Sequence, residues 1–182
     1  MLRKKSKRHF YIVTVIMVLL VIWTAWSNTT VGITHYTVAS DKLPASFDHY
    51  SIVVVSDLHN AEFGENNSQL IKLIEKEKPD IIVITGDLVD SNKTNIDIAQ
   101  KLVGTLTGIA PCYYVTGNHE AWLGEQYQEL ESILLDEGVA ILHDRAVQLI
   151  KNTESIQLAG LDDPDFTDRA PLQQSMIKTK IN

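Results

Sequence analysis

The sequence has little cysteine, and one end of it has no acidic residues. Cys112 is the only cysteine among 182 residues, so no disulfide can form within the chain, and we expect this residue to be buried in a strand. No aspartate or glutamate occurs before Asp41, whereas five of the 16 basic residues lie within the first eight positions. The rest of the chain is strongly acidic. It therefore lacks the basic surface that binding to a nucleic-acid backbone requires.

An apolar run follows the basic residues at the N-terminus. Positions 1–9 form a basic segment, and positions 10–26 contain no ionisable side chain except that of Tyr11. A helix over this run would be about 26 Å long, close to the roughly 30 Å hydrocarbon core of a bilayer. A cleavable signal peptide has the same features, but no small-x-small cleavage site follows the run. We expect a single-pass signal anchor in the cell membrane, with the N-terminus cytoplasmic and the remaining chain extracytoplasmic.

After this anchor, short apolar strands alternate with amphipathic helices. Residues 27–50 are expected to form a linker with a first strand at 31–38, and residues 51–182 to form a partial globular domain. The further predicted strands are 51–56, 80–85, 111–116, 139–142, 146–150 and 155–161, and the predicted helices are 68–78, 95–106 and 125–137. This order predicts parallel strands joined by crossover helices, which is an α/β fold.

Three of the predicted strands end in residue types that bind metal ions. The first is followed by Asp57 and His59, the second by Gly86 and Asp87, and the third by the run Gly117-Asn118-His119-Glu120. Because the carboxyl ends of parallel strands lie at one edge of the sheet, we expect these side chains to meet there. Asp-x-His or Gly-Asp alone is common by chance. The three motifs together, each after an apolar strand, predict a metal site.

This series of motifs resembles the first three signature blocks of the calcineurin-like metallophosphoesterase family. The resemblance is strong over 52–120 and looser over 33–161, and with its anchor the chain resembles the membrane-associated bacterial branch that includes UDP-diacylglucosamine hydrolase-like enzymes. The resemblance implies a β-sandwich flanked by helices and preceded by one transmembrane helix. It also implies two divalent metal ions, either manganese, iron or zinc, and hydrolysis of a phosphate ester by a metal-bridged hydroxide.

Carried over by position, the resemblance assigns a role to each motif residue. Asp57 and His59 would hold the first metal, Asp87 would bridge both metals, Asn118 would hold the second, and His119 would protonate the leaving group. The substrate would be a phosphomonoester, a phosphodiester or a pyrophosphate.

The family pattern also includes a later histidine and a Gly-His-x-His block, which this sequence lacks. We therefore expect the first half of the domain only, in a chain truncated at its C-terminus. The alternative hypothesis is a catalytically incompetent membrane protein that lacks the C-terminal metal ligands.

Other segments are weaker candidates for the site. His143 is expected in a turn between two short strands, and the carboxylates of 162–165 are expected in a solvated turn rather than beside the site. Trp122 is expected either to form a wall of the cleft or simply to pack. Residues 173–182 are expected to begin a helix.

Overall fold

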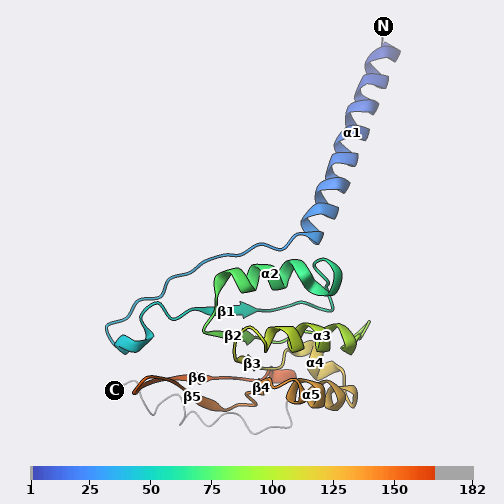
Figure 1. Cartoon of the computed structure of the whole chain (residues 1–182). Helices are drawn as coiled ribbons and strands as arrows, with labels where there is room; N and C mark the ends of the chain where they lie inside the picture. Colours follow the sequence, from blue (N-terminus) through green and yellow to red (C-terminus); the bar gives the residue numbers. More distant parts are fainter. Residues whose placement is uncertain (1, 167–182) are drawn as a thin grey trace. The chain divides into compact units, whose positions relative to one another are not determined.

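The computed structural model describes residues 2–166, which belong to two separate units. The first unit ends at Thr34 and contains helix α1 (Leu2–Thr29) (Figure 1). The segment Lys7–Thr24 of this helix is long and apolar enough to cross a membrane, a test that a signal sequence also passes. The helix extends beyond the predicted 10–26 span because the lysine and arginine residues before it also favour helix. The predicted helix at 173–182 lies outside the described residues.

The second unit begins at His35 and contains a parallel sheet of four strands. The strands lie side by side in chain order, and they are β1 (Ile52–Val55), β2 (Ile81–Ile84), β3 (Cys112–Tyr114) and β4 (Ala140–Ile141). The main helices between successive strands are α2 (Ser68–Glu77), α3 (Ile96–Leu106) and α5 (Gln126–Asp136) (Figure 1). The α/β class and the alternation of strands and helices are therefore confirmed.

A two-stranded antiparallel sheet packs on the parallel sheet. Its strands are β5 (Ala146–Lys151) and β6 (Glu154–Ala159). The buried side chains of Phe47, Ile81 and Leu149 form a cluster with partly buried residues of both sheets, which are Tyr50, Val83, Tyr113, Val147, Ile156 and Leu158. Because side chains alternate along a strand, Ile82 and Ile84 of β2 point to the opposite face, where they are buried. The result is the predicted β-sandwich flanked by helices.

Two predicted strands differ in the structure. Within the described residues no strand precedes β1, and the stretch 31–38 is mostly exposed to solvent. A sequence with strand propensity forms a strand only where a neighbouring strand pairs with it. The second difference concerns β1, whose apolar sequence is typical of a buried strand. Its Ile52 and Val54 are exposed. They pair with Ile81 and Val83 and point to the same face, which the two-stranded sheet covers over β2 but leaves open over β1.

A short helix that the sequence analysis did not predict follows β3. This helix, α4 (Asn118–Trp122), begins immediately after Gly117. Asn118 and His119 therefore lie in the first turn of a helix and not on an extended strand end. Successive residues of a helix point about 100° apart, so the two side chains still point in different directions.

Cys112 is buried at the start of β3, as predicted. Burial raises the pKa of its thiol to about 11. Because the thiolate is the reactive form of cysteine, this residue is an inert part of the core at neutral pH.

Candidate metal centre

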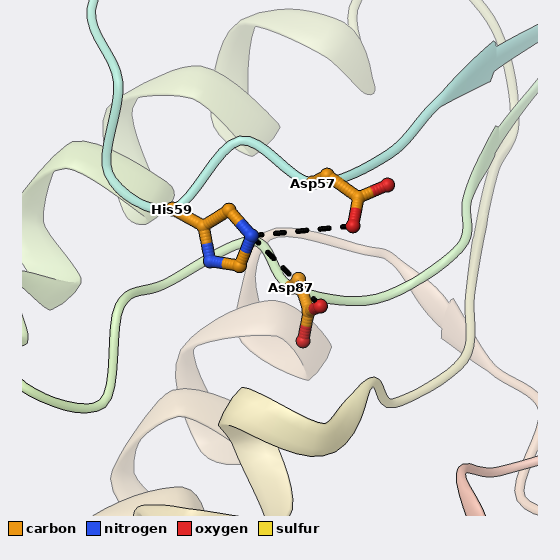
Figure 2. A group of neighbouring side chains, drawn as sticks. All are labelled: Asp57, His59 and Asp87. Atoms are coloured by element: carbon orange, nitrogen blue, oxygen red, sulfur yellow. Dashed lines mark ion pairs between the residues drawn. The ribbon is translucent and has the colours of Figure 1, made fainter.

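Three of the predicted metal ligands converge at the carboxyl edge of the parallel sheet. Asp57 and His59 lie in the loop after β1, and Asp87 lies in the loop after β2 (Figure 2). The distance from His59 Nε2 is 4.0 Å to Asp57 Oδ1 and 3.9 Å to Asp87 Oδ2. One ligand atom from each residue lies within 4.8 Å of the other two. The structure thus brings these three residues together around one point.

The spacing of these atoms fits a divalent metal ion. An ion bound about 2.0–2.2 Å from each ligand atom separates ligands on its opposite sides by about 4.4 Å, so small side-chain movements suffice to bind one. Two carboxylates and an imidazole suit manganese, iron or zinc. His59 Nδ1 is buried and has no hydrogen-bond partner among residues 2–166. Nε2 is the ring nitrogen that faces Asp57 and Asp87, so it is the one available to a metal ion.

The loops that carry the ligands have an uncommon backbone conformation. The φ angles are 54° at Asp57, 46° at His59 and 50° at Asp87, in the left-handed region that residues other than glycine rarely adopt. The chain therefore turns between Asp57 and His59 and does not continue the extended path of β1. Such residues cost about 1 kcal/mol or more each, and they cluster at functional sites where the surrounding structure holds them.

Gly86 and Gly117 bring the loops after β2 and β3 into backbone contact. A Cβ atom on Gly86 would collide with the backbone of Gly117, and one on Gly117 would collide with the side chain and backbone of Asp87. Gly86 also has a φ of 90°. Each motif therefore requires glycine, because the loop that carries the other motif leaves no room for a side chain at that position. Together they place Asn118 next to the loop of Asp87.

The two oxygens of the Asp87 carboxylate have different surroundings. The backbone N–H of His119 donates to Oδ1 at 2.9 Å, whereas Oδ2 faces His59 Nε2. The first turn of α4 therefore holds one oxygen and leaves the other directed into the ligand group. The Asp87 side chain is only 13% exposed, so its position is well defined by the protein.

The carboxylate of Glu120, to which the sequence analysis gave no role, joins the same two loops. Glu120 is fully buried. Its Oε2 accepts hydrogen bonds from the backbone N–H groups of Asp87 and Gly117, both at 2.8 Å, and its Oε1 accepts from those of Leu88 at 2.8 Å and Val89 at 3.4 Å. An ionised carboxylate has only acceptors, which suits four converging donors. The only feature of the sequence that could have indicated this role is the position of Glu120 directly after Gly-Asn-His.

His119 lies beside the ligand group. Its ring centroid is 4.4 Å from that of His59, and its side chain is 17% exposed. Its Nδ1 accepts a hydrogen bond from the backbone N–H of Ser91 at 3.1 Å. In the neutral ring this contact places the proton on Nε2. His119 therefore presents an N–H donor at Nε2.

Asp90 is a second residue that the sequence analysis did not single out. Its Oδ1 is 3.7 Å from His119 Nδ1. The pKa of the Asp90 carboxyl is lowered mainly by the backbone N–H of Asn92, with a smaller contribution from His119. An ionised Asp90 stabilises the protonated imidazole. The only feature of the sequence that could have placed Asp90 near the site is its position three residues after Asp87.

His143 and Asp162 do not belong to the ligand group and form a network of their own. His143 Nδ1 lies 2.8 Å from Asp162 Oδ2, and its Nε2 lies 2.5 Å from Glu131 Oε1. Asp162 also accepts a hydrogen bond from the Thr116 hydroxyl at 2.8 Å. Burial alone would raise the pKa of Asp162, but the hydrogen bonds from His143 and Thr116 outweigh it and lower the pKa. The predicted solvated turn is therefore wrong for Asp162, whose side chain is 3% exposed.

Comparison with known proteins assigns this site to a family. Residues 50–170 match the model of the calcineurin-like phosphoesterase family, and the chain belongs to this family, as the motif resemblance predicted. An uncharacterized metallophosphoesterase of Aquifex aeolicus is 34% identical over 132 residues, which cover 71% of this chain and 48% of that protein. A transmembrane protein with metallophosphoesterase domain from Danio rerio is 30% identical over 128 residues, 68% of this chain and 29% of that protein.

The chain spans about half the length, or less, of these relatives. A solved structure, that of phosphopantetheinyl hydrolase from Mycobacterium tuberculosis, aligns with a TM-score of 0.45 and 18% identity over 60% of this chain and 41% of that one. The apolar N-terminal helix and the relatives named transmembrane proteins indicate that this chain is a membrane protein.

Replacement of Glu120 by glutamine is predicted to loosen the site. A glutamine amide has one acceptor oxygen, and its NH2 group would face backbone N–H donors, which leaves buried donors unpaired at about 1–3 kcal/mol each. We expect a lower free energy of unfolding in urea and weaker Mn²⁺ binding in calorimetric titration. Glu129→Gln, at an exposed position of α5, is the control and should change the free energy of unfolding by less than about 0.5 kcal/mol. Wild-type values for Glu120→Gln in both measurements would contradict this account of Glu120.

Proposed function

We propose that the chain forms the metal-binding part of an enzyme that hydrolyses phosphate esters with two divalent metal ions. Membership of the metallophosphoesterase family implies metal-dependent hydrolysis of a phosphate ester. The observation that carries the proposal is the convergence of Asp57, His59 and Asp87, with His119 in ring contact with His59.

In this proposal the ligands divide between two ions. Asp57 and His59 would hold the first ion, Asn118 would hold the second, and Asp87 would be a ligand of both; α4 holds one oxygen of Asp87 and leaves the other directed at His59. Bound divalent ions supply charge neutralisation at the phosphoryl group and lower the pKa of water at the site. The left-handed loops and the Glu120 carboxylate keep the protein ligands in place, so little reorganisation is needed when the ester binds.

His119 is proposed as the general acid. Its Nε2 carries the proton in the neutral ring because Nδ1 accepts from the Ser91 amide. The proton that reaches the departing oxygen comes from Nε2 of the imidazolium form, in which Nδ1 also carries a hydrogen and no longer accepts from Ser91. The ring is left neutral after the transfer. Asp90 stabilises the protonated form of the ring through the contact at Nδ1.

Replacement of His119 by asparagine tests this role. We expect the full-length protein, residues 1–182, with this change to keep its bound Mn²⁺ and to hydrolyse alkyl phosphate esters about 10²–10⁴ times more slowly. Nitrophenyl esters should be affected much less, because nitrophenolate leaves without protonation. Both rates and the metal content are measured on the same sample. Equal losses for the two leaving groups, or loss of metal, would show that His119 positions metal or phosphate instead.

The same assay separates the enzyme from the alternative of a catalytically incompetent membrane protein. Hydrolysis of either ester that depends on added Mn²⁺ supports the enzyme. Saturable Mn²⁺ binding without hydrolysis would support the alternative, in which the ligands of this chain hold a metal but do not complete a working site.

We further propose that α1 anchors the protein in the cell membrane with its catalytic domain outside the cytoplasm. Five basic residues precede the apolar run, and such residues remain on the cytoplasmic side. Alkaline phosphatase fused after Asn182 is therefore expected to be active, and a cytoplasm-specific reporter at the same position is expected to be silent. The reverse pattern would overturn this orientation.

A further inference from the structure

We propose that Trp122 is a specificity-determining residue that packs against a planar aromatic leaving group of the phosphate ester. This inference rests on the proposed function, because it uses His119 to place the leaving group. It adds the chemical class of the alcohol released: one with a neutral aromatic ring close to the ester oxygen.

Trp122 combines exposure with contact to the proposed acid. It is 57% exposed. Its ring centroid nevertheless lies 5.0 Å from that of His119, at an interplanar angle of 45°. An indole that served only the core would be buried, since burial of its large apolar surface is what stabilises a fold. Trp122 instead keeps more than half of its surface available beside the ligand group.

The indole is held in place at its polar edge. Trp122 Nε1 donates a hydrogen bond to Asp165 Oδ2 at 3.2 Å. Asp165 lies in the 3-10 helix η3 (Pro164–Phe166), and the residues before η3 are tied to the end of β3. The backbone N–H of Asp163 donates to the carbonyl of Thr116 at 3.3 Å, and Asp162 accepts the Thr116 hydroxyl. A ring fixed in this way loses little conformational entropy when a ligand packs on it.

The position of Trp122 selects the leaving group rather than the phosphoryl group. The phosphoryl oxygens belong at the ligand group of Asp57, His59 and Asp87, and the departing oxygen belongs at His119. Trp122 is in ring contact with His119 and lies three residues further along α4. The chemical group attached to the departing oxygen is therefore the part of the substrate that meets the indole.

The charges near the indole favour a leaving group without further phosphates. The carboxylate of Asp165 accepts a hydrogen bond from Trp122, and Asp90 Oδ1 lies 3.7 Å from His119 Nδ1. A leaving group that carried additional negative charge would be repelled by both. A neutral aromatic ring gains the contact with the indole without this penalty.

Two phosphonates that differ only in one group test the inference by binding, without turnover. Phenylphosphonate and methylphosphonate are titrated calorimetrically into the Mn²⁺-loaded full-length protein in detergent micelles. We expect the wild-type protein to bind phenylphosphonate about two- to tenfold more tightly. Trp122→Ala should bring the ratio of the two dissociation constants close to one, whereas Trp122→Phe should keep the preference. Leu135→Ala, which removes an equally exposed apolar side chain from α5, is the matched control and should retain the wild-type ratio.

Each outcome decides the inference. A wild-type ratio in Trp122→Ala would overturn it. Equal affinity of the wild-type protein for the two phosphonates, including affinity too low to detect for both, would overturn it as well. The metal centre is tested separately by the Mn²⁺ dependence of methylphosphonate binding. Loss of that dependence with a retained phenyl preference would contradict the proposed function and leave the role of the indole standing.

Discussion

The metal centre depends on the buried carboxylate of Glu120. Its two oxygens accept four backbone N–H groups from two loops that follow different strands, so one side chain sets the distance between Asp87 and the start of α4. A buried charge is costly unless it is fully hydrogen-bonded, and here the backbone provides that compensation. The close approach of Gly86 and Gly117 depends on the same geometry, because a Cβ atom on either would force the loops apart.

The fold places the metal-ligand residues at the carboxyl edge of the parallel sheet, and the conformation of the loops then orients their side chains. Parallel strands β1 and β2 bring Asp57, His59 and Asp87 to the same end of the sheet, but the left-handed residues aim the side chains at one point. The segment after β6 contributes from another direction. Asp162, held by His143, fixes the end of β3, and Asp165 fixes Trp122 beside His119. The site therefore has a metal-binding part and an aromatic part, joined by His119.

The sequence predicted the features that depend on local patterns. Apolar runs and helical periodicity located the strands and the three crossover helices, and the motif residues after the strands located the ligand group. The parts it did not predict depend on contacts between distant segments. Glu120 accepts hydrogen bonds from backbone N–H groups of distant loops, and Asp90 lies near the imidazole of His119. Only the fold brings these groups together. Residues 31–38 have strand propensity but no partner strand within the part of the chain that the structure describes, and Asp162 is buried by segments far from it in the chain.

Joint metal binding by Asp57, His59 and Asp87 is measured by Mn²⁺ titration of the metal-free full-length protein, followed by the electron paramagnetic resonance signal of free Mn²⁺. The amide of Asp87→Asn can still accept the His119 N–H, so this change removes chiefly the charge and the oxygen that faces His59. We expect saturable binding by the wild-type protein and binding at least about tenfold weaker in Asp87→Asn. Equal affinity and equal stoichiometry in the two proteins would contradict it.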